Sequence, residues 1–237
     1  MARRAAACVG LAPRGPVKIL AHRGNVDGPD RANENRLALV GEALARGFGL
    51  ETDVRYAAGQ GFYISHDPAT PLPESLLAMH CALWRRHPEA TIALNVKELG
   101  QERALLEALN GLRVVQQVFL FDMELIETRA GETARLYRRY DAALSLAARV
   151  SDRGEPLERA LAIEVASVVW LDEFDGPWAT AETVGRLKAA RKTVYAVSPE
   201  LHGRPLDEAQ ARWRDFARWG VDGICTDWPA LLAAHHG

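Results

Sequence analysis

Gly49-Leu50-Glu51-Thr52-Asp53-Val54-Arg55 is the stretch around which both the fold and the chemistry of this chain are organised. We expect it to form an extended strand, in which residues two positions apart point to the same face. Glu51 and Asp53 would then share one face, where their charges repel each other unless a cation lies between them. A hard divalent cation is the usual partner of such a carboxylate pair.

The segment after this strand is expected to return along it. Gly59-Gln60-Gly61 predicts a turn, and Phe62-Tyr63-Ile64-Ser65 is again extended. A parallel neighbour needs a crossover of a dozen or more residues, which this connection lacks. Residues 61–66 should therefore fold back antiparallel, as a hairpin extension of the strand. That placement returns His66, whose imidazole can carry a proton near neutral pH, toward the two carboxylates.

The rest of the chain alternates short apolar runs with amphipathic segments, and alternation of this kind predicts a parallel sheet. The first strand, Val17–Ala21, ends at His22. The next strand is expected at 48–54, and later ones at 91–97, 118–122, 142–148, 167–171, 193–197 and 223–226. Helices are expected at 33–46, 74–86, 100–109, 124–139, 155–162, 180–191, 206–219 and 230–235.

Eight strand–helix units in 237 residues fit a closed (β/α)8 TIM barrel with a β-hairpin extension after strand two. The alternative is an open, doubly wound sheet. His22-Arg23-Gly24-Asn25 after the first strand does not match the glycine-rich dinucleotide fingerprint found in many such sheets. We expect residues 1–16 to be a flexible leader and residues 17–237 to be a single barrel domain.

The composition is that of an ordinary globular protein, with 48% hydrophobic and 25% charged residues and a net charge of −2. No basic run indicates nucleic-acid binding, and no apolar run approaches the roughly 20 residues of a membrane span. The three cysteines form neither a disulfide framework nor a zinc motif. We expect a cytoplasmic protein, with export through the weakly apolar start as the less favoured alternative. The oligomeric state is left open.

Active sites of (β/α)8 barrels lie at the C-terminal ends of the strands. Isolated polar residues there, such as Ser198 and Asp227, are most simply explained by contact with solvent. Two histidines beside two inward carboxylates and a lysine indicate a function instead. Polar residues are expected at this end at His22, Arg23, Glu51, Asp53, Asn95, Lys97, Asp122, Asp172, Ser198 and Asp227.

This set of side chains suits a phosphodiester, which is anionic and therefore a poor target for a nucleophile. A divalent ion on the carboxylate pair would neutralise that charge as a Lewis acid. Arg23 and Lys97 would hold the non-bridging oxygens. His22 and His66 would act as general acid and base, although their spacing does not tell which residue plays which part.

Four motifs in this order and spacing resemble the glycerophosphodiester phosphodiesterase family. They are Ala21-His22-Arg23-Gly24, Glu34-Asn35, Glu51-x-Asp53-Val54 and His66-Asp67. Asn95-Val96-Lys97 and the closing segment 220–229 also resemble the family. The resemblance implies a TIM barrel, bound Mg²⁺ or Ca²⁺, two catalytic histidines and a role in lipid metabolism. The implied reaction converts a small glycerophosphodiester into an alcohol and glycerol 3-phosphate, with Glu34 among the substrate-binding residues.

The sequence departs from the family pattern at Asn95, where the family usually has a glutamate two residues before its lysine. An amide oxygen can ligate Mg²⁺ or Ca²⁺ but brings no charge. We expect weaker metal affinity or help from another acid, for which Asp122 is the candidate. Asp122 could equally be a rim residue paired with an arginine. A second departure is Arg36, which stands where the family has a threonine.

Two other functions stay open. A weakened barrel could bind a phosphorylated ligand without turning it over, and a phosphodiesterase could act on an envelope or capsule polymer. In the loop 198–204, Glu200, His202 and Arg204 could contact a headgroup or sugar, but a solvated loop is the simpler expectation. His80 is expected to be structural.

Overall fold

A computed structural model describes residues 16–236 of the chain. Residues 1–15 of the predicted leader lie outside the described residues. The strands are β1 (Lys18–His22), β2 (Gly49–Ala57), β3 (Gly61–Ile64), β4 (Ile92–Val96), β5 (Val118–Phe121), β6 (Ser145–Val150), β7 (Val168–Leu171), β8 (Thr193–Val197) and β9 (Gly223–Thr226). The helices are α1 (Leu37–Ala45), α2 (Leu77–Trp84), α3 (Glu102–Gly111), α4 (Glu132–Tyr140), α5 (Leu157–Ala162), α6 (Ala181–Ala189), α7 (Leu206–Trp219) and α8 (Pro229–His236).

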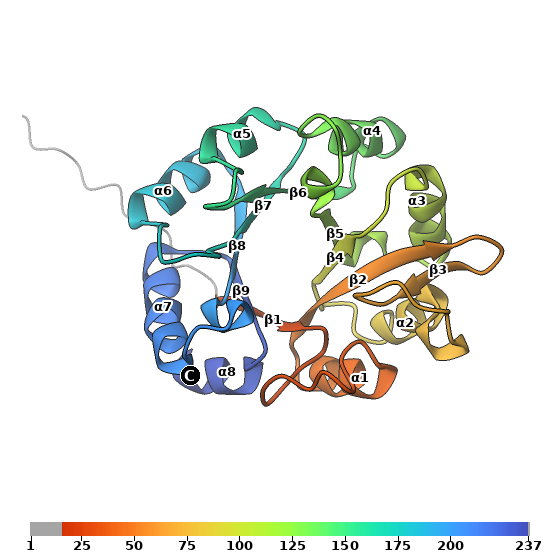
Figure 1. Cartoon of the computed structure of the whole chain (residues 1–237), viewed down its shortest axis with the longest axis horizontal. Helices are drawn as coiled ribbons and strands as arrows, with labels where there is room; N and C mark the ends of the chain where they lie inside the picture. The colour runs from red at the N-terminus through yellow and green to blue at the C-terminus, as the bar shows by residue number, and fades with distance from the viewer. Residues whose placement is uncertain (1–15, 237) are drawn as a thin grey trace, which may run out of the picture.

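Eight of the strands close into a parallel barrel, which confirms the predicted (β/α)8 architecture. The hydrogen-bonded order is β1-β9-β8-β7-β6-β5-β4-β2, and β1 pairs with β2 to close the ring. The helices surround this ring on its outside (Figure 1). Every residue of β4 and of β5 is buried, because the strands are covered by helices outside and by side chains inside.

The predicted hairpin is also present. β3 pairs antiparallel with the far end of β2, with Arg55 opposite Tyr63 and Ala57 opposite Gly61. β3 lies outside the ring, next to β2 and α2 (Figure 1). The short turn leaves no room for a parallel crossover, so the chain turns back over the barrel rim.

Close packing at the start of β2 explains a glycine at that position. A Cβ atom on Gly49 would lie 2.5 Å from the carbonyl oxygen of Thr91 and from a methyl group of Leu20. Any larger residue would push β2 away from its neighbours β1 and β4. The register of the carboxylates on β2 depends on this contact.

Two apolar clusters make up the core. The larger one lies between the strands and the helices, and the smaller one fills the barrel interior. Inside the barrel, Phe119 and Phe121 from β5 pack against Trp170 and Tyr195 from β7 and β8. The Phe121 and Trp170 ring centroids are 4.4 Å apart. These rings fill the interior, so the barrel is a packed core and not a channel.

The largest shift of a predicted helix start is in the range 124–139, where α4 begins only at Glu132. The carboxylate of Glu127 accepts hydrogen bonds from the backbone N–H groups of Gly131 and Thr133, and Gly131 is left-handed with φ 75°. This local capping holds the preceding residues in a loop.

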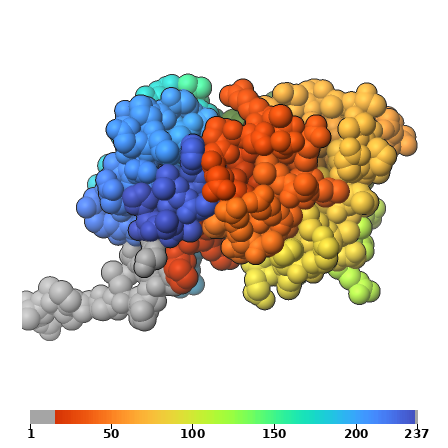
Figure 2. Space-filling model, turned by 90° about the horizontal axis from the view of Figure 1, so that it is seen from below, coloured from red at the N-terminus to blue at the C-terminus, as the bar shows by residue number. Residues whose placement is uncertain are grey.

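The two ends of the described chain meet beside β1. α8 follows β9, and the backbone N–H of Ala230 donates to the carbonyl of Val26. Figure 2 shows the blue C-terminal segments directly against the red N-terminal ones. Among the described residues, no helix has both the length and the apolar character that a membrane crossing requires.

Candidate functional site

A cavity of about 620 Å³ lies at the mouth of the barrel, at the C-terminal ends of its strands. It brings together segments that are far apart in the sequence, because all parallel strands end at this face. All nine residues predicted for the site line it: His22, Arg23, Glu34, Glu51, Asp53, His66, Asn95, Lys97 and Asp122.

Strand register places the predicted metal ligands in rows across the sheet. Glu51 lies beside His22 of β1, and Asp53 lies beside Asn95 of β4. Glu51 and Asp53 are almost completely buried, at 4% and 1% exposure. Two carboxylates in so little water need compensating positive charge.

Nearby positive charge stabilises the ionised form of Asp53 more than that of Glu51. Burial and the charge of Asp53 raise the pKa of Glu51 to about 7. Burial also opposes ionisation of Asp53, but Lys97 and Arg23 outweigh it and lower the pKa of Asp53. Lys97 Nζ is 3.0 Å from Asp53 Oδ1, and Arg23 Nε is 3.3 Å from Asp53 Oδ2. Glu51 is therefore the carboxylate that lacks a close cation.

Three of the residues that line the cavity carry a buried oxygen without a hydrogen bond from a described residue: Glu51 Oε2, Asp53 Oδ1 and Asn95 Oδ1. Asp53 Oδ1 has only the ion pair with Lys97. Oxygens of carboxylates and amides are the ligands that Mg²⁺ and Ca²⁺ prefer, so these three side chains fit a hard divalent cation. Within residues 16–236, no three or more His, Cys, Asp or Glu side chains cluster as a metal site. The donor set consists of two acids and one amide.

Asp122 is paired with an arginine, which is the second of the two possibilities that the sequence left open. Both of its carboxylate oxygens bond to the guanidinium of Arg149, and Asn95 Nδ2 donates to Asp122 Oδ2 at 2.9 Å. These bonds argue against Asp122 as a direct metal ligand. Asp122 instead orients the Asn95 amide, which leaves the oxygen of that amide unpaired.

His22 is held by a residue whose role the sequence did not indicate. Asp227, at the end of β9, lies with Oδ1 2.7 Å from His22 Nδ1 and also accepts from Asn25. Burial opposes protonation of His22, but the Asp227 bond and the charge of Glu51 raise its pKa. The other ring nitrogen, Nε2, is 3.8 Å from Glu51 Oε2. The sequence signal that could have indicated this contact is the position of Asp227 directly after β9, the strand that pairs with β1.

Glu34 is bonded to Arg23 at the mouth. Its Oε1 accepts from Arg23 NH1 at 3.0 Å. A carboxylate would repel a phosphate, so this pair indicates that Glu34 orients the guanidinium. Arg23 itself is in a left-handed conformation with φ 50°, directly after β1.

His66 follows β3 and reaches the mouth from the hairpin. Its Nδ1 is 3.0 Å from Asp67 Oδ1, and its backbone carbonyl accepts two hydrogen bonds from Arg55. Its side chain is more exposed than that of His22, at 41% against 19%. The hairpin thus brings a second, more solvated imidazole to the cavity that holds Glu51 and Asp53.

A second polar wall lies across the mouth, beyond Asp122. Arg149 bonds to Asp122 and to Asp172, and Asp172 in turn pairs with His202. The expected solvated loop 198–204 therefore contributes a histidine to the cavity. Arg149 is the member that strand-end reasoning missed, because the expected strand ended one residue before it.

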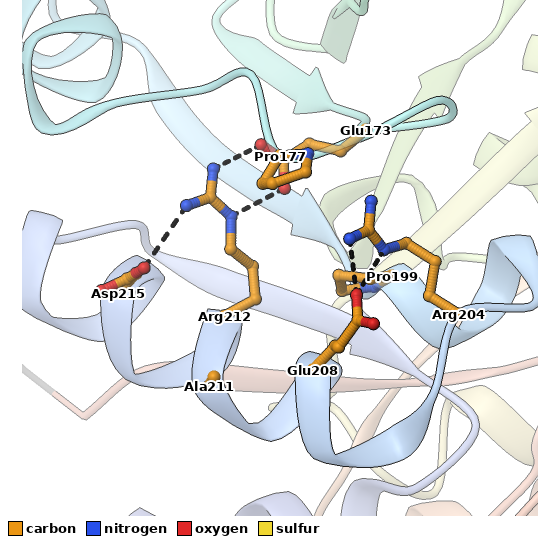
Figure 3. A pocket seen from close by; sticks show the side chains of 8 residues that line it. All are labelled: Glu173, Pro177, Pro199, Arg204, Glu208, Ala211, Arg212 and Asp215. Atoms are coloured by element: carbon orange, nitrogen blue, oxygen red, sulfur yellow. Dashed lines mark hydrogen bonds and ion pairs between the residues drawn. The ribbon is translucent and has the colours of Figure 1, made fainter.

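Another cavity, of about 390 Å³, lies outside the barrel between α7 and the loops that follow β7 and β8 (Figure 3). Arg212 is bonded there to Glu173 and Asp215, and Arg204 is bonded to Glu208. These pairs neutralise the charges of both arginines. The barrel mouth is the cavity with carboxylates and imidazoles directed into it.

No family model matches the sequence, and no curated protein is significantly similar to it. Solved structures do match. A Galdieria sulphuraria protein assigned as a glycerophosphodiester phosphodiesterase has a TM-score of 0.74 at 18% identity, with 94% of this chain and 98% of that chain covered. A glycerophosphodiester phosphodiesterase from Parabacteroides distasonis has a TM-score of 0.67 at 14% identity, with 94% and 97% covered.

A phosphodiesterase from Oleispira antarctica, solved with the product sn-glycerol-3-phosphate, has a TM-score of 0.65 at 17% identity, with 92% of this chain and 96% of that chain covered. Barrels named for other functions also match, with TM-scores of 0.50 to 0.57. At these identities the likeness is one of fold. The chain therefore has the closed (β/α)8 fold of the solved glycerophosphodiester phosphodiesterases, and the residues of its own motifs meet at the mouth of that barrel.

Proposed function

We propose that this protein is a metal-dependent phosphodiester hydrolase that acts on a small glycerophosphodiester-like molecule. The observation that carries the proposal is the group of three buried oxygens on Glu51, Asp53 and Asn95 beside a histidine held by Asp227. The Glu51 and Asn95 oxygens have no hydrogen bond from a described residue, and Asp53 Oδ1 has only its ion pair with Lys97. The fold shared with glycerophosphodiester phosphodiesterases supports it, as does the product bound to the Oleispira antarctica relative. Fold alone would not specify the reaction.

In the proposed reaction the charged residues of the mouth bind the phosphodiester. Arg23 and Lys97 both line the cavity and supply the cationic donors that non-bridging phosphate oxygens need. A divalent cation on Glu51, Asp53 and Asn95 would neutralise charge on the phosphate as a Lewis acid. With the ion bound, the high pKa of Glu51 would fall, because the carboxylate would gain a counter-charge.

The two histidines supply the proton transfers. Asp227 accepts a hydrogen bond from the N–H at His22 Nδ1, so Nε2 is the atom through which His22 gives or takes a proton. His66 provides the second imidazole from the hairpin, where its exposure lets it exchange protons with water. One acts as general base on the attacking group and the other as general acid on the leaving oxygen.

The test is hydrolysis of bis(p-nitrophenyl) phosphate and of a glycerophosphodiester with Mg²⁺, Ca²⁺ or Mn²⁺. His22→Ala and His66→Ala should each lower the rate by about 10²–10⁴-fold. His87→Ala is the matched control, because His87 precedes β4 at the opposite end of the barrel. Full activity in EDTA would refute the role of the metal, and unchanged rates in both histidine variants would refute their role in proton transfer.

A binding protein without turnover is the second candidate, and Asn95 is the residue that favours it. The amide brings no charge to the metal, and it is held by Asp122, so it cannot swing freely toward an ion. Calorimetry separates the two functions. Binding of a glycerophosphodiester without measurable binding of Mg²⁺ or Ca²⁺, and without hydrolysis, would favour the binder.

A further inference from the structure

His202 belongs to the barrel mouth, although a solvated loop was the simpler of the two expectations for its segment. It ends a short 3₁₀ helix, η4 (Pro199–His202), that follows β8, and it lines the same cavity as His22. In the closed ring, β8 lies four strands from β4, which carries Asn95. His202 therefore faces the metal-binding side of the cavity from across the mouth.

The partner of His202 determines which ring nitrogen is available to a ligand. His202 Nε2 contacts Asp172 Oδ1, and Asp172 Oδ2 is taken by Arg149. Burial alone would raise the pKa of Asp172, but the bonds from His202 and Arg149 lower it. Asp172 is therefore a carboxylate that only accepts, so Nε2 carries a hydrogen. In the neutral ring, Nδ1 then presents a lone pair.

Nδ1 has no hydrogen-bond partner among the described residues, whereas the charged groups behind it are already bonded to each other. Arg149 lies between Asp122 and Asp172 and bonds to both. Phe121 and Trp170 form an apolar floor beside them in the cavity. The wall thus offers a ligand one free acceptor above aromatic rings, a pattern that suits a hydroxyl on a carbon chain.

His202 is also held rigidly enough to discriminate between ligands. Its ring packs on Phe174 with centroids 4.4 Å apart. The turn that carries it is tied to β9 by Glu200, whose carboxylate accepts from the Thr226 hydroxyl and from the backbone N–H of Asp227. Glu200 therefore couples the position of His202 to the residue that holds His22. A side chain held in place loses little entropy when it binds.

We propose that His202 is a specificity-determining residue, whose Nδ1 accepts a hydrogen bond from a hydroxyl of the alcohol esterified to the phosphate. This proposal rests on the proposed phosphodiester function and names the part of the substrate that lies across the mouth. It assigns the polar half of the cavity to a hydroxylated alcohol such as a second glycerol.

An ammonium could also donate to Nδ1. The guanidinium groups of Arg149 and Arg153 nearby do not exclude it, because Arg149 is paired with Asp122 and Asp172 and Arg153 with Asp175. Glycerophosphoethanolamine, which carries an ammonium in place of the hydroxyls, therefore separates the two donors in the experiment.

The experiment compares two substrates that differ only in hydroxyl groups, glycerophosphoglycerol and glycerophosphopropane. Wild type should prefer the glycerol ester, and His202→Phe should reduce that preference about 3- to 10-fold in kcat/KM, as expected for one hydrogen bond. His202→Gln keeps an acceptor and should retain part of the preference. His87→Phe is the matched control.

Each result decides the proposal. An unchanged substrate ratio in a folded His202→Phe protein would overturn it. So would an effect of His202→Phe confined to the hydrolysis of glycerophosphoethanolamine, because an ammonium would then be the donor to Nδ1. If wild type hydrolyses no phosphodiester with any of the three metals, the proposed function fails. In that case calorimetry measures the dissociation constants of glycerophosphoglycerol and glycerophosphopropane, in wild type and in His202→Phe. The ratio of these two constants tests whether His202 recognises the hydroxyl without turnover. A ratio that is equal in both proteins would overturn the proposal by this route too.

Discussion

Asp227 Oδ1 lies 2.7 Å from His22 Nδ1, although 205 positions separate the two residues in the chain. Barrel closure produces this contact, because β9 pairs with β1 immediately before both side chains. Asp227 thereby determines that Nδ1 faces the carboxylate and that Nε2 faces the mouth. In the sequence, Asp227 is most simply explained as a strand-end residue in contact with solvent. In the structure, it positions the proposed catalytic histidine, His22.

Asp227→Asn should lower kcat/KM by about 10²–10⁴-fold, because a neutral amide neither fixes the ring nor stabilises its protonated form. The Asp227 bond raises the pKa of His22, so removing the carboxylate should lower that pKa. The limb of the pH–rate profile that belongs to His22 should move to lower pH. NMR titration of the His22 ring measures the shift directly, and an unchanged titration would contradict this role of Asp227.

Asn95→Asp should destabilise the metal-free protein by about 1–3 kcal/mol. The substitution removes the donor that bonds to Asp122 at 2.9 Å and puts a second carboxylate in its place. Excess Mg²⁺ or Ca²⁺ should then raise the melting temperature more than in wild type, because the new carboxylate adds charge to the ion site.

Asn33→Asp is the matched control for this experiment, since Asn33 also donates to an aspartate but is exposed. The difference in melting temperature between Asn33→Asp and wild type should be the same in EDTA as in excess metal. A metal-induced shift of the same size in Asn95→Asp and wild type would argue against Asn95 as a ligand.

Arg149→Met should cost about 3–5 kcal/mol of unfolding free energy, because it leaves Asp122 and Asp172 buried without their shared cation. Urea unfolding measures the loss. Arg153→Met is the control on the same Phe174 ring, and its exposed pair with Asp175 should contribute little. Equal stability of the two variants would show that the Arg149 network does not support the mouth.

His80→Leu should make the protein more resistant to acid. Burial lowers the pKa of His80 to about 4, whereas an unfolded histidine titrates near about 6.5. Between these values the unfolded chain binds a proton that the native protein does not. Above about pH 6.5, His80 therefore does not lower the free energy of unfolding. As the pH falls from about 6.5 to about 4, that free energy decreases by about 3 kcal/mol. The leucine variant should lose this dependence.

The measurement is urea unfolding at pH 7 and pH 4.5, with His87→Leu as the control that keeps the acid sensitivity. At neutral pH the leucine should also be tolerated well, because both ring nitrogens of His80 are buried without partners among the described residues. An acid-induced loss of equal size in wild type and His80→Leu would assign the sensitivity to other groups.

Much of the fold followed from local patterns. The strand at 193–197, the helix at 206–219 and the strand at 223–226 have the predicted bounds, because each pairs a clear apolar period with a turn or cap. The hairpin followed from chain length alone. The start of α4 could not be predicted, since the side chain of Glu127 caps residues further along the chain and overrides helix propensity.

The sequence by itself determined the barrel and the residues at its mouth, since strand periodicity and strand ends are local properties of the chain. It also identified the carboxylate pair on β2 and the hairpin that carries His66. Tertiary structure alone decided which side chains are partners. Asp227 with His22, Arg149 between Asp122 and Asp172, and His202 across the mouth all depend on ring closure. Contacts between distant strand ends are long-range, and no local pattern records them.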